Sequence, residues 1–253
     1  MGIAGFFNRL KSLGFFQHEI KDLKVIADAQ LPLAALEKLS QFAEIIPFST
    51  QKIVYPAISG HPDIFFSQTD ENLLITAPNL PEKYYQILQE SAISYIKGKT
   101  PLGMKYPETA LYCALSGKDF IIHNFKITDE VLKNQSLDKK KYSIHQGYTR
   151  CSLFHFSNRA LILSDRKALK ILSENFDTFY ISPDSIILPG MPHGFIGGAL
   201  GSFEDKVFLT GSLQFLKEGQ ELKRWIHKKG FELIELYQGP IFDGGSLLFI
   251  RKN

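Results

Sequence analysis

The amino-acid sequence predicts a single α/β domain that is built from five copies of one small unit. One pattern recurs along the chain: an apolar strand, a polar turn, a second apolar strand, a helix and a third apolar run. The copies are almost evenly spaced, and the fifth is divided between the two ends of the chain. These three observations favour one repeated domain across the 253 residues.

The strand pairs define a register for the repeat. Four pairs begin near positions 63, 110, 151 and 198, and a lone strand begins near position 245. We take the second residue of each copy as its anchor. The anchors are Ile64, Leu111, Ser152, Ala199 and Ser246, at steps of 47, 41, 47 and 47 residues. Because the turns within the pairs are rich in Ser, Asn, Asp and Gly, each unit is expected to begin with an antiparallel hairpin and to continue with a helix and a third strand.

The missing half of the fifth copy stands at the front of the chain. Residues 24–30 supply its second strand, residues 32–43 its helix and residues 44–49 its third strand. Val25 is expected beside Leu248, because this pairing leaves neither end strand with an exposed edge. The predicted architecture is a five-unit pseudo-symmetric α/β propeller over residues 22–253, closed by its N- and C-terminal segments. An ordinary α+β domain with alternating hairpins and helices is the alternative.

Composition narrows the classes of function. The chain has 29 basic and 26 acidic residues, and its one dense basic run is at positions 139–141, so no nucleic-acid partner is expected. Two cysteines, Cys113 and Cys151, fit a reducing compartment better than a disulfide framework and predict a cytoplasmic location. No stretch has the roughly 18 apolar residues that a membrane-spanning helix needs.

Residues 1–21 form a separate segment ahead of the repeat. Ile3, Phe6, Phe7, Leu10 and Leu13 approximate one stripe of an amphipathic helix. We expect a helical extension that packs on the domain, on a second copy or on another partner. Weak attachment to a membrane surface is the alternative.

The linker ahead of each first strand is the expected place of a site. The five linkers combine Gly or Pro with polar side chains, which lets a ligand approach the backbone and predicts a small-molecule ligand. Asp63 is suited to hold a guanidinium or amine through charge-assisted hydrogen bonds, or it caps a turn. Glu108 adds a second carboxylate for a cation or a proton, or it is a solvated loop residue.

Cys151 stands one position before its anchor, as Asp63 and Gly245 stand before theirs. It is a candidate nucleophile whose thiolate the adjacent Arg150 would favour, or a small buried side chain at the start of a strand. Arg150 could instead bind a carboxylate, and Tyr148 could line the pocket. Neither close metal-ligand spacing nor a phosphate loop or dinucleotide motif occurs, so no metal or cofactor is expected.

Several segments resemble the pentein fold of the guanidino-group-modifying enzymes, which include amidinotransferases, arginine deiminases and dimethylarginine dimethylaminohydrolases. The segment His61–Phe66 resembles the first-unit segment of that family, in which an Asp contacts the substrate. The segment FDGGSLLFIRK, from position 242, resembles the C-terminal segment that carries the nucleophilic Cys, but Gly244 and Gly245 stand in place of that Cys. Gly147–Cys151 resembles a Gly-Tyr-Thr-Lys/Arg-Cys segment of an uncharacterised bacterial family of this fold.

The resemblance also implies roles for individual side chains. His193, in a Gly-rich loop, resembles the general acid/base His of the family, although a structural His in a loop is equally consistent and His145 is a second candidate. The family implies a guanidino, amidine or amino ligand in the central pocket, contacted by His61, Asp63 and Glu108, with Cys151 as a non-standard nucleophile. The alternative is a noncatalytic ring, a pseudoenzyme that binds a macromolecular partner. Whether the chain is an enzyme is left open.

Overall fold

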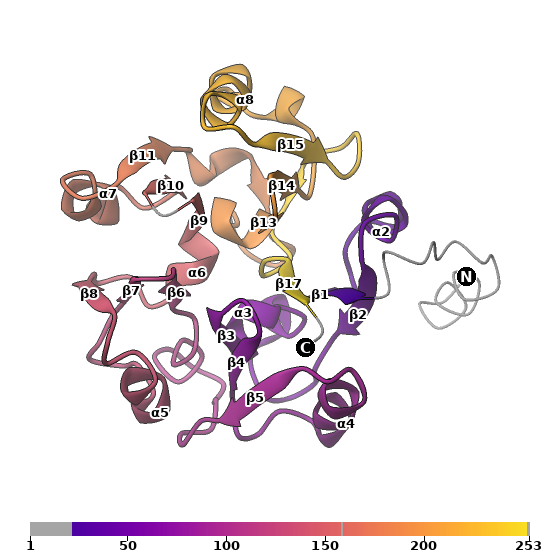
Figure 1. The fold of residues 1–253 in the computed structure, drawn as a ribbon. Coiled ribbons are helices and arrows are strands. Elements are labelled where there is room, and N and C mark those ends of the chain that lie inside the picture. The colour runs from indigo at the N-terminus through magenta and orange to yellow at the C-terminus, as the bar shows by residue number, and fades with distance from the viewer. Residues whose placement is uncertain (1–21, 158, 252–253) are drawn as a thin grey trace.

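The computed structural model describes residues 22–157 and 159–251, which adopt a mixed α/β fold. Five three-stranded sheets surround the middle of the molecule, each with a helix on its outer side (Figure 1). In every one of these sheets the second strand lies in the centre, antiparallel to the first strand and parallel to the third. A helix connects the two parallel strands, as such a pair requires. The predicted order of strand, strand, helix and strand is confirmed in these five sheets.

The elements of the first three sheets follow one another along the chain. The first sheet contains β3 (Phe66–Asp70), β4 (Leu73–Thr76) and β5 (Ser94–Lys97), with helix α4 (Glu82–Glu90). The second contains β6 (Leu115–Ser116), β7 (Phe120–His123) and β8 (Lys140–Ser143), with helix α5 (Glu130–Asn134). The third contains β9 (Leu153–Ser157), β10 (Ala160–Leu163) and β11 (Asp177–Tyr180), with helix α7 (Arg166–Leu172).

The remaining elements include the sheet that joins the two ends of the described chain. The fourth sheet contains β13 (Leu200–Phe203), β14 (Lys206–Leu209) and β15 (Glu232–Glu235), with η5 (Leu213–Phe215) and helix α8 (Gly219–Lys228). The fifth contains β17 (Leu248–Arg251), β1 (Leu23–Asp28) and β2 (Glu44–Phe48), with helix α2 (Leu33–Leu39). A two-stranded parallel ladder is formed by β12 (Ile186–Ile187) and β16 (Ile241–Phe242), and short 3₁₀ turns occur at η2 (Pro56–Ile58) and η3 (Pro183–Ser185).

The predicted starts of the first strands are wrong, because helical turns precede several of them. One-turn helices lie at α3 (Pro62–Phe65), α6 (Thr149–Ser152) and η4 (Ile196–Ala199), so three of the five anchor residues are helical. In α3, Pro62 begins the helix, where its fixed φ is favourable and its missing N–H is not needed. The residues after Pro62 are all buried, because this helical turn packs within the core. A continuous apolar run is also typical of a buried strand, so the sequence suggested a strand from position 63.

The pairing of β17 with β1 is confirmed, but its predicted register is off by one residue. Val25 faces Phe249 and Ile26 faces Leu248, so Val25 is not opposite Leu248. The two faces of this ladder enter different parts of the core. Val25 and Phe249 pack in one buried cluster, and Ile26 and Leu248 pack in another. A shift of one residue would exchange the two sets, so packing specifies the observed register.

Among the described residues, the apolar core consists of four buried clusters that lie between neighbouring sheets. The largest of them receives side chains from the first, second and fifth sheets and also contains both cysteines, Cys113 and Cys151. Within residues 22–157 and 159–251, no helix is both long enough and apolar enough to cross a membrane. The expected amphipathic helix at residues 1–21 lies outside the described residues.

Candidate functional site

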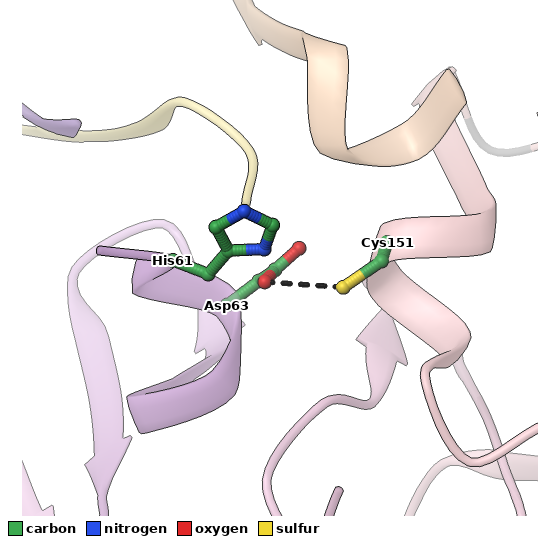
Figure 2. A group of neighbouring side chains, drawn as sticks. All are labelled: His61, Asp63 and Cys151. Atoms are coloured by element: carbon green, nitrogen blue, oxygen red, sulfur yellow. Dashed lines mark hydrogen bonds between the residues drawn. The ribbon is translucent and has the colours of Figure 1, made fainter. Parts of the chain in front are cut away.

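Two helical turns from different sheets bring a carboxylate and a thiol together near the middle of the molecule (Figures 1 and 2). Asp63 lies in α3 and Cys151 in α6. Cys151 Sγ donates a hydrogen bond to Asp63 Oδ1 at 3.2 Å, and Ser246 Oγ donates one to Asp63 Oδ2 at 2.6 Å. All three residues are buried. The repeat register assigns equivalent positions to Asp63 and Cys151, and in the structure these positions are in contact.

Backbone hydrogen bonds hold the linkers of different sheets against one another at this point. The Asp63 N–H donates to the carbonyl of Gly245 at 3.1 Å. The N–H groups of Gly244 and Ser246 both donate to the carbonyl of Gly198, at 3.1 and 2.7 Å. The segments ahead of β3, β13 and β17 are therefore joined directly, and the side chains they carry have little freedom to move.

Arg150 supports this junction from the third sheet. Its guanidinium donates to the carbonyls of Gly197 and Leu200, at 2.8 and 3.1 Å, and it lies 5.1 Å from the centre of the Phe154 ring. Burial lowers the pKa of the guanidinium, and the Asp63 carboxylate opposes this effect. Through its hydrogen bonds to Gly197 and Leu200, the Arg150 side chain connects α6 to the fourth sheet. Two of its donors are engaged by carbonyls, which is a structural use that the sequence did not indicate.

Cys151 has the environment of a protonated thiol. It is 3% exposed, and Cys113 Sγ lies 3.5 Å from its sulfur. Burial raises the pKa of the Cys151 thiol well above its ordinary value, and the neighbouring Cys113 thiol and Asp63 carboxylate raise it further. A reactive cysteine needs accessibility and a stabilised thiolate. The structure provides Cys151 with neither, and both cysteines are free thiols.

A second carboxylate, Asp243, lies beside His61 in the same buried region. Asp243 accepts hydrogen bonds from the N–H of Phe195 at 2.8 Å and from the N–H of Gly245 at 3.1 Å. Burial raises its pKa, nearby His61 lowers it, and Asp63 raises it. His61 Nδ1 is 3.9 Å from Asp243 Oδ1, too far for a hydrogen bond, and this buried nitrogen has no hydrogen-bond partner.

The position where the resemblance expects a nucleophilic Cys has no room for a side chain. Gly245 has φ +66°, in the left-handed region that favours glycine. A Cβ at this position would lie 2.2 Å from His61 Cβ and 2.4 Å from His61 Cα. At Gly244, a Cβ would lie 2.6 Å from Leu31 Cδ2. His61 therefore occupies the space that a side chain at position 245 would need.

Three tyrosines, Tyr55, Tyr106 and Tyr148, form a partly exposed group that we call the tyrosine rim. The Tyr148 hydroxyl is 2.5 Å from Thr109 Oγ1 and 3.3 Å from the Tyr55 hydroxyl, and the rings of Tyr106 and Tyr148 are 5.9 Å apart. Burial raises the pKa of Tyr148 and of Tyr55. Tyr55 and Tyr148 pack against the buried cluster that contains Cys113 and Cys151, so the rim lies next to the buried centre.

Glu108 and His193 lie apart from the buried centre. Glu108 is exposed, two residues from Tyr106, and its carboxylate lies against Gly103. His193 is half-buried, its Nδ1 is 3.0 Å from the carbonyl oxygen of Gly194, and its ring is 5.5 Å from that of Phe195. Within the described chain, His193 makes no hydrogen bond with Cys151 or Asp63. The general acid/base role expected of His193 and the cation-binding role expected of Glu108 stay predictions.

Sequence reasoning missed three residues that contact the site. Ser246 was an anchor of the repeat, so its place at the centre could have been read from the register. Asp243 belongs to the FDGG segment and directly precedes Gly244 and Gly245, the two residues at which the sequence departs from the resemblance. Cys113 lies inside an apolar run, and nothing in the sequence indicates that its sulfur approaches Cys151.

Comparison with solved structures identifies the fold. SxtG, an amidinotransferase from Microseira wollei in the saxitoxin biosynthetic pathway, is 12% identical, with a TM-score of 0.52 over 84% of this chain and 87% of its own. A Pseudomonas aeruginosa dimethylarginine dimethylaminohydrolase, carrying a Cys-to-Ser substitution and in complex with citrulline, is 9% identical, with a TM-score of 0.52 over 90% of this chain and 98% of its own. Both have the pentein fold of guanidino-modifying enzymes, and at these identities the likeness shows the fold alone.

No curated protein matches the sequence. The sequence does match a family over residues 26–248, a range that contains four of the five sheets in full and the fifth without the first three residues of β1 and the last three of β17. The chain has the pentein fold and belongs to the family of unknown function DUF6873.

Proposed function

We propose that this chain is a binding protein that takes a small guanidino, amidine or amino cation at the tyrosine rim and performs no covalent chemistry through a cysteine thiolate. In this proposal the five sheets are the pseudo-symmetric units of a propeller that the β17–β1 pairing closes. The structural neighbours include an amidinotransferase and a dimethylarginine dimethylaminohydrolase, and both names indicate substrates with a guanidino or amidine group, which supports a ligand of that class.

The observation that carries the proposal is the packing of His61 against Gly245. A Cβ at position 245 would lie 2.2 Å from His61 Cβ, so the site excludes even the smallest side chain there. Cys151 does not replace the missing thiol, because it is buried and its sulfur donates a hydrogen bond to Asp63. Covalent catalysis needs an accessible nucleophile within reach of a base. Noncovalent binding needs neither.

The tyrosine rim has the chemistry to hold a cation. Tyr106 is 52% exposed, and its ring is tilted against that of the half-buried Tyr148. The faces of aromatic rings attract guanidinium and ammonium groups. Glu108, two residues from Tyr106, would supply a negative charge and charge-assisted hydrogen bonds. Asp63, in contrast, is fully buried and hydrogen-bonded to Ser246 and Cys151, so a guanidino or amino ligand at the rim would contact Glu108 and not Asp63.

A thermal-shift titration with arginine and citrulline tests the proposal. The two compounds have similar shapes, but arginine carries a cationic guanidinium where citrulline carries a neutral ureido group. A ligand at 100 times its Kd stabilises the folded state by about 2.7 kcal/mol, which raises the Tm of a chain of this size by about 5–10 °C. We expect arginine, or agmatine if a carboxylate is not tolerated, to raise the Tm, and citrulline to leave it unchanged.

Two variants identify the binding surface. Glu108→Gln is expected to weaken binding at least about tenfold, because a hydrogen bond to a charged group contributes about 1.5 kcal/mol or more. Glu90→Gln, at an exposed glutamate at the end of α4, is the matched control and should bind as the wild type does. Equal stabilisation by arginine and citrulline, or an unchanged affinity in Glu108→Gln, would contradict the proposal. Failure of every guanidino, amidine and amino compound would favour the noncatalytic ring with a macromolecular partner.

A further inference from the structure

Three potential metal ligands from two sheets meet in the buried centre. One ring nitrogen of His61, a carboxylate oxygen of Asp63 and the sulfur of Cys151 all lie within 4.8 Å of one another. Figure 2 shows the His61 ring above the Asp63–Cys151 pair, with one of its nitrogens directed toward them. The repeat register assigns equivalent positions to Asp63 and Cys151, but the sequence did not predict that they lie with His61 as a set of metal ligands.

The unpartnered nitrogen of His61 is an independent sign that something is bound there. His61 is 1% exposed, and its Nδ1 is buried without a hydrogen-bond partner. Leaving a buried polar atom unpaired has a cost in free energy, because the atom loses its hydrogen bonds to water. The neighbouring Asp243 oxygen does not relieve this cost, since it is 3.9 Å away. A cation between His61, Asp63 and Cys151 would give this nitrogen a partner.

The hydrogen bond from Ser246 leaves one oxygen of the Asp63 carboxylate available to bind a metal ion. Ser246 Oγ holds Asp63 Oδ2 at 2.6 Å, so Oδ1, which now accepts the Cys151 hydrogen, is the oxygen that faces the cluster. Hydrogen bonds of this kind commonly orient a carboxylate that binds a metal. Asp243 Oδ1 lies 3.9 Å from His61 Nδ1 and would stabilise the positive charge of the ion.

A second thiol is placed to complete the coordination. Cys113 Sγ is 3.5 Å from Cys151 Sγ. This is much longer than a disulfide bond of about 2.05 Å. It is close to the separation of about 3.8 Å that two thiolates have on one tetrahedral zinc ion with Zn–S distances of about 2.3 Å. A small rotation of the Cys113 side chain would bring its sulfur into a fourth position.

We propose that His61, Asp63 and Cys151 bind a Zn²⁺ ion, with Cys113 as the fourth donor. Zinc suits this set because it accepts nitrogen, oxygen and thiolate ligands in tetrahedral geometry. Cys151 would form a bond to the ion through its sulfur and release the proton that it now donates to Asp63 to solvent. Cys113 would likewise bind as a thiolate and release its proton. No oxidation or reduction takes place. Because the donors are buried, the ion enters during folding or a transient opening.

Titration of the reduced full-length protein with Co²⁺ tests the proposal. The protein is first freed of metal with a chelator, and Co²⁺ is then added both to the folded chain and during refolding from urea. We expect one ion per chain and a near-ultraviolet thiolate-to-cobalt charge-transfer band, which excess Zn²⁺ abolishes. Absence of this band under both conditions would overturn the proposal. This test needs no variant, because the sequence has only two cysteines: Cys151 belongs to the cluster and Cys113 lies beside it.

Variants then assign the ligands. Cys151→Ser is expected to weaken Zn²⁺ binding by more than about 100-fold, since loss of a ligand should exceed the 10–100-fold effect of losing an outer contact. Cys113→Ser should also weaken binding, and His61→Asn should do so with the charge-transfer band retained at saturation. His193→Asn is the matched control and should bind as the wild type does. Unchanged Zn²⁺ affinity in folded Cys151→Ser or His61→Asn would contradict the assignment.

Discussion

Replacing Gly245 with alanine is expected to lower the free energy of unfolding by about 2–5 kcal/mol. Two costs add at this position. The left-handed backbone conformation, with φ +66°, costs about 1–2 kcal/mol for a residue that has a Cβ. The new Cβ would also lie 2.2 Å from His61 Cβ and 2.4 Å from His61 Cα, and overpacking of this kind costs typically 1–3 kcal/mol or more. Urea-induced unfolding, followed by far-ultraviolet circular dichroism, measures the sum.

Gly230 provides a control that separates these two costs. It follows α8 with φ +82°, and a Cβ there would have nothing within 4 Å. Gly230→Ala should therefore cost about 1–2 kcal/mol, which is the backbone contribution alone. A destabilisation of Gly245→Ala no larger than that of Gly230→Ala would show that His61 does not occupy the space at position 245. The same clash predicts that Gly245→Cys destabilises the fold and does not restore a catalytic thiol.

Replacing Asp63 with alanine is expected to lower the free energy of unfolding by about 2–4 kcal/mol. The substitution removes the acceptor of two buried hydrogen bonds, from Ser246 Oγ and Cys151 Sγ, and hydrogen bonds to a charged group contribute about 1.5–3 kcal/mol each. Ser246 retains a second acceptor, the carbonyl of Gly197 at 3.1 Å, so the loss stays below the sum of two full bonds. Urea unfolding in the presence of a chelator measures this effect without a contribution from bound metal.

Asp70 supplies the comparison for Asp63. It lies at the end of β3 and is exposed, so Asp70→Ala should change stability by no more than about 0.5 kcal/mol. If Asp63→Ala were equally mild, the Asp63 carboxylate would not hold the segments ahead of β3 and β17 together. If Asp63→Ala stays folded, its arginine titration separates the tyrosine rim from the buried centre, because the rim assignment predicts that binding is retained.

The repeated unit could be predicted because each copy has its own local pattern. Hairpin turns, helix periodicity and apolar strands recur at a nearly constant spacing, and the split fifth copy indicates that the two ends pair. The start of each first strand could not be predicted in the same way. In α3, the buried Ile64 and Phe65 look like strand residues, and only the tertiary packing shows that one helical turn precedes β3. The register between Val25 and Phe249 likewise depends on which core cluster each face enters.

The candidate site was predictable in position and less so in chemistry. The register placed Asp63, Cys151 and Gly245 at equivalent points, and these linkers do meet. The protonation of Cys151 depends on its burial and on the approach of Cys113 from another sheet, which one sequence does not reveal. Arg150 was expected to favour a thiolate, but it is directed at the carbonyls of Gly197 and Leu200. Those contacts join residues about 50 positions apart in the sequence, and only the tertiary structure shows that they meet.

The proposed function requires that no accessible thiolate operates in the middle of this pentein fold. Iodoacetamide alkylation of the metal-free, reduced protein at pH 7, followed by peptide mass spectrometry, tests it most directly. Because Cys151 is 3% exposed and Cys113 is fully buried, we expect both thiols to be alkylated in the native chain no faster than it unfolds, and rapidly in urea. Rapid, selective alkylation of Cys151 in the native protein would contradict this requirement and reinstate Cys151 as a nucleophile.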